Sequence, residues 1–175
     1  MRRFVIIGTV VILGIIGVTA AAVAPLLMIA STFSVAPEPS DGDMIEHFHA
    51  NRAKLERLAQ MAREDSRLER LATDFSKPEN PTAAGITPER LALYRQLFRQ
   101  AKTPLGFYNF PDSTIIVFHA SGLATSGSGR AFVHGEAPHA AEIVDGDLIE
   151  AAKGQNRVYL ARKIATGWWI TLDRS

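Results

Sequence analysis

The sequence contains the residue types of a hydrolytic triad: Ser126 or Ser128 as the nucleophile, His119 or His134 as its base, and Asp112 or Asp145 as the orienting acid. A serine attacks well when a histidine within hydrogen-bond reach takes its proton and a third group orients that histidine. The segment around Ser128 lacks the Gly-x-Ser-x-Gly pattern of a strained nucleophile turn. Hydrolysis is therefore the alternative function, and we assign no catalytic residue.

The five histidines also raise the question of a metal site. His119 and His134 could meet across adjacent strands, with Glu136 or His139 as a third ligand. No spacing in the sequence requires that set, and solvated or hydrogen-bonded histidines are common. We predict no metal and no cofactor.

A hairpin near the C-terminus carries exposed aromatic candidates. Two β-like runs flank Gly167, which suits the left-handed position of a three-residue turn. Alternation puts Trp168 in the core and turns Tyr159 and Trp169 to the other face. Aromatic residues on an open sheet face often mark a partner surface, and the alternative is that a helix or loop covers them. Tyr159 and Trp169 are therefore candidate partner-binding residues.

Arg95 and Arg99 lie one helical turn apart and form a small basic stripe. Such a stripe could contact anionic lipid or an acidic partner, whereas like charges on a helix often serve only solubility. We include both arginines in the candidate partner surface.

Two amphipathic helices must support these residues. Ser40 with Asp43 fits a helix N-cap followed by an acidic third position, which predicts a helix over 42–64. Thr87 before a proline fits the start of a second helix. Residues 65–75 suit either an extension of the first helix or a short strand.

The C-terminal half changes to short β-branched and aromatic runs broken by glycine and polar residues. Runs 114–120, 129–135, 157–164 and 168–173 predict an antiparallel meander of about four strands. The segment 137–155 connects them and holds one short helix. Together with a transmembrane helix and the two amphipathic helices, these strands predict an α+β fold.

The N-terminal run Phe4–Ala30 contains no charged residue and is long enough to span a bilayer. Arg2 and Arg3 precede it, whereas Glu38 and Asp41 follow it. By the positive-inside rule the N-terminus stays in the cytoplasm and the remainder is exported. Residues 4–30 thus predict single-pass attachment to the inner membrane.

This reading divides the chain into an anchor over 1–31, a linker over 32–42 and an exported domain over 43–175. The alternative is a cleaved signal peptide, because Ser34-Val35-Ala36 has the small residues of a cleavage site. The apolar run is longer than a signal peptide needs, which favours the anchor.

Composition excludes several classes of function. The chain has no cysteine, which excludes disulfides, thiolate nucleophiles and Cys-ligated zinc. Acidic and basic residues number 18 and 19, and no basic excess indicates nucleic-acid binding.

The order of these features resembles small uncharacterised membrane-anchored envelope proteins of Gram-negative bacteria. The resemblance rests on short motifs: Gly85-Ile86-Thr87-Pro88-Glu89-Arg90 with Tyr94-Arg95, Gly122-Leu123, Ser126-Gly127-Ser128, Arg162-Lys163-Ile164 and Trp168-Trp169. It implies a bacterial, periplasmic domain and brings no established activity or catalytic residue.

The function predicted from these observations is a membrane-anchored extracytoplasmic accessory or protein-interaction module rather than an enzyme. Its expected partner is another envelope protein. The oligomeric state and the biological process do not follow from the sequence.

Overall fold

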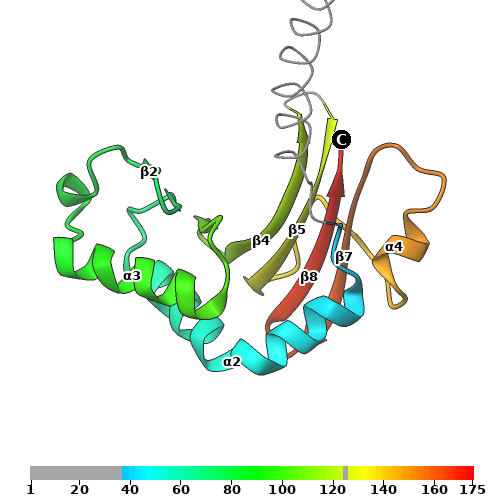
Figure 1. Cartoon of the computed structure of the whole chain (residues 1–175), viewed down its shortest axis with the longest axis horizontal. Helices are drawn as coiled ribbons and strands as arrows, with labels where there is room; N and C mark the ends of the chain where they lie inside the picture. The colour runs from blue at the N-terminus through cyan, green and yellow to red at the C-terminus, as the bar shows by residue number, and fades with distance from the viewer. Residues whose placement is uncertain (1–36, 124–125) are drawn as a thin grey trace, which may run out of the picture. The chain divides into compact units, whose positions relative to one another are not determined.

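The computed structural model describes residues 37–123 and 126–175, which fold as helices packed on an eight-stranded sheet (Figure 1). The helical elements are α2 (Asp41–Glu64), the 3-10 turn η1 (Pro81–Ala84), α3 (Pro88–Ala101) and the short α4 (Leu148–Ala151). The strands are β1 (Arg70–Leu71), β2 (Ser76–Lys77), β3 (Phe107–Asn109), β4 (Ser113–Leu123), β5 (Ser126–Gly135), β6 (Glu142–Ile143), β7 (Val158–Ala165) and β8 (Trp168–Arg174).

The prediction of about four strands is wrong. The α+β class holds, but the sheet has eight strands in the order β2-β1-β3-β4-β5-β8-β7-β6. The four long strands match the predicted runs, and the other four are only two or three residues long. Such short strands form through pairing with neighbours and have no periodicity of their own. The meander is also wrong, because β8 rather than β7 pairs with β5.

No helix within residues 37–123 and 126–175 has the length and apolar character to cross a membrane. The run 4–30, on which the transmembrane prediction falls, lies outside the described residues, as does the candidate cleavage site at 34–36. The fold established by the described residues is therefore α+β with an eight-stranded sheet.

Both main helices begin where their capping residues predict. Ser40 precedes α2 and forms a capping box with Asp43, in which each side chain accepts a hydrogen bond from the other residue's backbone N–H. Thr87 caps α3, and Pro88 takes the first helical position. The ambiguous segment 65–75 does not extend α2, which ends at Glu64; it enters the short β1–β2 hairpin instead.

One row of directly opposed residues forms the middle of the core. Leu71, Phe107, Ile116, Phe132 and Ile170 face each other on successive strands, and each is at most 1% exposed. Directly opposed residues share a sheet face, so this row defines the face that the helices cover. The buried residues of α2 and α3 pack on it, and Figure 1 shows both helices on the same side of the sheet.

The β7–β8 hairpin has the predicted turn. Gly167 adopts a φ of 69°, and the register shifts between Lys163 and Ala165, as in a bulged hairpin. Trp168 is 1% exposed and joins the core, which confirms the alternation predicted for this hairpin. Trp169 therefore lies on the face opposite the helices.

Candidate functional site

A second row of opposed residues crosses the other face of the sheet from β2 to β7. We call it the transverse row; it consists of Lys77, Arg70, Tyr108, Ile115, Val133, Trp169 and Lys163. Its centre is aromatic and aliphatic, and each end carries a cationic side chain. The row is therefore an apolar strip between positive ends, and its central residue Val133 is fully buried.

Small side chains lie beside the transverse row. Val117, Ala131, Thr171 and Ala161 are opposed on β4, β5, β8 and β7, and Ala131 and Thr171 are 7% and 3% exposed. Because larger residues flank these small ones, the face is hollowed there. The result is a groove of about 370 Å³, whose lining includes Tyr108, Ile115, Val117, Ala131, Tyr159 and Thr171.

Tyr159 and Trp169, the predicted aromatic pair, take different places on this face. Tyr159 lines the groove, and burial followed by the negative charge of Asp173 raises the pKa of its phenol, which keeps the hydroxyl neutral. Trp169 lies in the transverse row, with the Lys163 ammonium 5.6 Å from its ring centroid. Its indole Nε1–H donates to the Gly135 carbonyl at 3.4 Å. Both rings are partly buried.

Arg95 and Arg99 do not join this aromatic surface. Both are exposed on α3, whose buried residues pack on the opposite side of the sheet. The partner surface predicted from sequence thus divides into two separate places, and only Tyr159 and Trp169 share the groove face.

The sequence reasoning missed the residues at the other end of the groove. Tyr108 and Phe110 both line it, and Phe110 is 49% exposed. Buried Phe107 alternates with Tyr108 and Phe110 in the way typical of a strand. A strand of three residues, however, is too short for its hydrophobic periodicity to be recognised in the sequence.

The residues considered for hydrolysis do not form a nucleophile and base pair. Ser128 Oγ donates a hydrogen bond to the Glu38 carboxylate. His119 lies opposite Arg130, and its Nε2 is buried with no hydrogen-bond partner among the described residues. His134 lies six residues from Ser128 along β5, about 20 Å at the rise of a strand, and accepts from Arg63. His119, opposite Arg130, is four residues from His134 along the sheet, about 13 Å, which also rules out the metal pair considered from sequence.

A buried charge network fixes the start of α2 to the sheet. Asp41 is 1% exposed and accepts hydrogen bonds from Arg130 on β5, Arg162 on β7 and the Leu148 backbone N–H of α4. Arg130 is fully buried, and its Nε and Nη1 have no partner among the described residues. The Asp41 carboxylate is therefore the main compensation for a buried positive charge.

Glu38 makes a second connection just before α2. It pairs with Arg174 on β8 at 2.7 Å and accepts from Ser128 on β5. Burial alone would raise the pKa of the Glu38 carboxyl, but the hydrogen bonds from Ser128 and Arg174 bring it below its usual value. Part of the segment predicted as a linker, 32–42, is thus held on the sheet by ion pairs.

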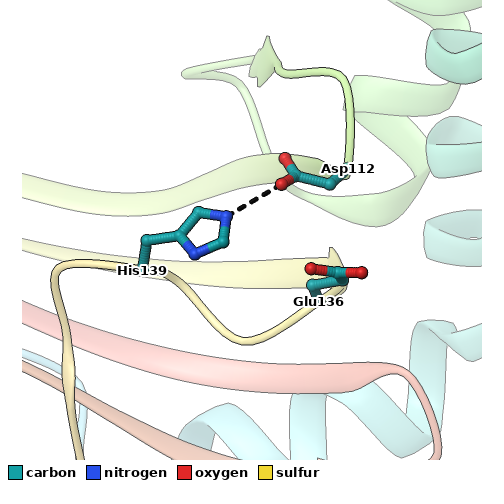
Figure 2. Close-up of side chains that lie close together, drawn as sticks. All are labelled: Asp112, Glu136 and His139. Carbon is teal, nitrogen blue, oxygen red and sulfur yellow. Dashed lines mark hydrogen bonds and ion pairs between the residues drawn. The ribbon is translucent and has the colours of Figure 1, made fainter.

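Asp112, Glu136 and His139 form an exposed cluster beside the ends of β4 and β5 (Figure 2). One ligand atom from each lies within 4.8 Å of the others, so the three could hold a divalent cation. His139 Nε2 lies 2.8 Å from Asp112 Oδ2, and this contact lowers the pKa of Asp112 and raises that of His139. A surface ion pair accounts for that geometry without a metal.

Comparisons of the chain with known protein families, curated proteins and solved structures found no match.

Proposed function

We propose that this protein is a non-enzymatic interaction module that binds an extended segment of a partner protein in the groove. The observation that carries the proposal is the groove itself, which has aromatic and aliphatic walls above a floor of small residues and also includes His119, Arg130 and Asp173 in its lining. Partner surfaces are typically rich in aromatic anchors. Tyr108, Phe110 and Tyr159 provide such anchors around the groove.

The arrangement of polar groups supports binding over catalysis. An enzyme site brings nucleophile, base and orienting group together in one hollow. In this protein Arg130, which lines the groove, is paired with Asp41, and Ser128 is engaged by Glu38. The groove face therefore offers mainly area and shape.

We also propose that the module works outside the cytoplasm, held at the inner membrane through residues 4–30. The support is the uncharged run preceded by Arg2 and Arg3. A C-terminal fusion to a reporter that is active only outside the cytoplasm should be active, and should stay with membranes after an alkaline wash. Activity from a cytoplasmic reporter alone would refute this orientation.

The binding proposal can be tested by site-specific photo-crosslinking in cells that make the full chain. A photoreactive phenylalanine at Phe110 should give a crosslinked protein of one defined mass. Ala131→Leu fills the groove floor and should remove that product, whereas Ala92→Leu, the same change on the exposed side of α3, should not. Both variants should melt as the wild type does. If Ala131→Leu gives the same crosslinked product as the wild type, the groove is not the binding site.

A further inference from the structure

Arg70 contacts two aromatic rings near one end of the transverse row. Its guanidinium carbon lies 4.5 Å from the Tyr108 ring centroid and 4.8 Å from that of Phe75. The two rings restrict the guanidinium and favour its positive charge. The side chain is therefore fixed before any ligand binds.

No acidic residue neutralises Arg70 within residues 37–123 and 126–175. The neighbouring Glu69 pairs with Lys77 at 2.6 Å instead. Arg70 Nε is buried and has no hydrogen-bond partner among those residues. Buried donors are nearly always paired in folded proteins, so the described residues do not supply the full set of acceptors that this guanidinium can use.

The hollow beside Arg70 has a volume of about 450 Å³. Glu69, Arg70, Phe75 and Lys77 contribute to it, and Tyr108 and Phe110 line both this hollow and the groove. A segment bound across Tyr108 and Phe110 would therefore contact both. The planar fork of an arginine matches a carboxylate, which it can bind through two parallel hydrogen bonds.

We propose that Arg70 binds the side-chain carboxylate of an Asp or Glu in the extended partner segment whose apolar side chains fill the groove. This inference rests on the proposed function and names the chemistry of its partner. Charge complementarity supports an acidic group at this end, because Arg70 and Lys77 line the hollow and the acidic residue in that lining, Glu69, already pairs with Lys77. Asp173 lines the groove itself, so the acidic group belongs beside Arg70. The partner segment is therefore acidic beside its apolar anchor.

The geometry also sets the spacing of the two partner residues. Arg70 on β1 is separated by β3 from the floor of the groove on β4 and β5, two to three strand spacings of about 4.8 Å each. An extended chain rises about 3.3 Å per residue, and every second side chain faces the same way. The carboxylate should thus lie about four residues from the apolar anchor.

The test uses random linear peptides displayed on phage and selected on the full chain in mild detergent. Peptides selected on the wild type should be enriched in Asp or Glu about four residues from an aromatic or aliphatic residue, in either order. Peptides selected on Arg70→Gln should keep the apolar residue and lose the acidic one. Arg95→Gln removes an exposed arginine on α3 and should select the same peptides as the wild type.

One selected peptide and its Asn or Gln counterpart then quantify the interaction. The amide version should bind the wild type at least about tenfold more weakly, and both versions should bind Arg70→Gln equally. Arg70→Lys keeps the charge and loses the fork, so it should also lose most of the preference. Melting curves identify any variant that fails to fold. If Arg70→Gln does not fold, the peptide preference of Arg70→Lys tests the role of the guanidinium.

Two results would overturn this inference while leaving groove binding intact. The first is that peptides selected on the wild-type protein show no enrichment of Asp or Glu. The second is that the preference for Asp or Glu survives in both Arg70→Gln and Arg70→Lys. The full chain can also be tested on vesicles of phosphatidylcholine with phosphatidylglycerol. If it binds them and Arg70→Gln abolishes that binding, the guanidinium binds lipid, and the inference of a peptide carboxylate is overturned. If no peptide binds, or if Ala131→Leu leaves peptide binding unchanged, the proposed function itself fails.

Discussion

Asp41 and Arg130 form a fully buried ion pair that joins the first residue of α2 to the middle of β5. A buried pair adds little over an apolar replacement of both partners, but removing one partner leaves an uncompensated charge in the interior. The connection between helix and sheet at this point therefore depends on Asp41.

We expect Asp41→Asn to lower the free energy of unfolding by about 3 to 5 kcal/mol, because it leaves the Arg130 charge buried and unpaired. Urea unfolding monitored by tryptophan fluorescence measures this loss. Asp145 is an exposed acidic residue in the loop before α4, so Asp145→Asn is the matched control and should change the free energy of unfolding little. A similarly small change in both variants would show that water reaches Arg130.

The two adjacent tryptophans should respond differently to truncation. Trp168→Ala removes a fully buried side chain and should lower the free energy of unfolding by about 3 to 5 kcal/mol. Trp169→Ala should cost less, because this ring is only partly buried on the groove face. Denaturant unfolding of both variants decides the order. Equal large losses would mean that Trp169 belongs to the core rather than to a binding surface.

Stability should fall as the pH decreases from about 7 to about 5. Burial lowers the pKa of His47 and of His134, and nearby Lys102 and Arg63 add to the respective effects. A histidine with a lower pKa in the folded state binds protons more readily when unfolded, where its pKa is about 6.5. Acidification below that value therefore favours unfolding, and the folded state loses stability until the folded pKa is passed.

Urea unfolding at a series of pH values tests this sign. Replacing His47 and His134 with glutamine should flatten the dependence in that range. His139 has a raised pKa because it pairs with Asp112, so its contribution has the opposite sign and is lost as the pH rises. His139→Gln should therefore make the loss on acidification slightly steeper. Stability that rises on acidification in the wild type would contradict burial of the two neutral imidazoles.

Removal of divalent cations should leave folding unchanged. The exposed cluster of Asp112, Glu136 and His139 is the ligand set that the described residues bring within 4.8 Å, and the Asp112–His139 ion pair already satisfies two of its members. The melting curve of the full chain should be the same with and without a chelator. A drop of several degrees with the chelator, lost in His139→Ala, would identify this cluster as a metal site.

Local signals in the sequence predicted the elements that form locally. Ser40 and Thr87 marked the starts of α2 and α3, and Gly167 marked the turn of the β7–β8 hairpin. These positions depend on neighbouring residues only, through caps and turn geometry.

The sheet and the groove could not be predicted in the same way. Strands of two or three residues carry no period, and the pairing of β5 with β8 joins segments far apart in the chain. Tyr108 and Tyr159 share the groove only because five strands align in one register. Arg70 likewise depends on Phe75 and Tyr108 from two other segments. Alternation identified the face of Tyr159 and Trp169 but not the other residues on it.

The sheet ends on both sides in strands of two residues, β2 and β6. Edges this short present few free backbone groups for another chain to pair with. A segment crossing the strands within the groove would likewise meet side chains instead of a ladder of N–H and C=O groups. Recognition of this kind depends on side chains. Substitution of backbone N–H groups of the bound peptide by N-methyl groups should therefore weaken binding little, which strand addition to a sheet edge would not allow.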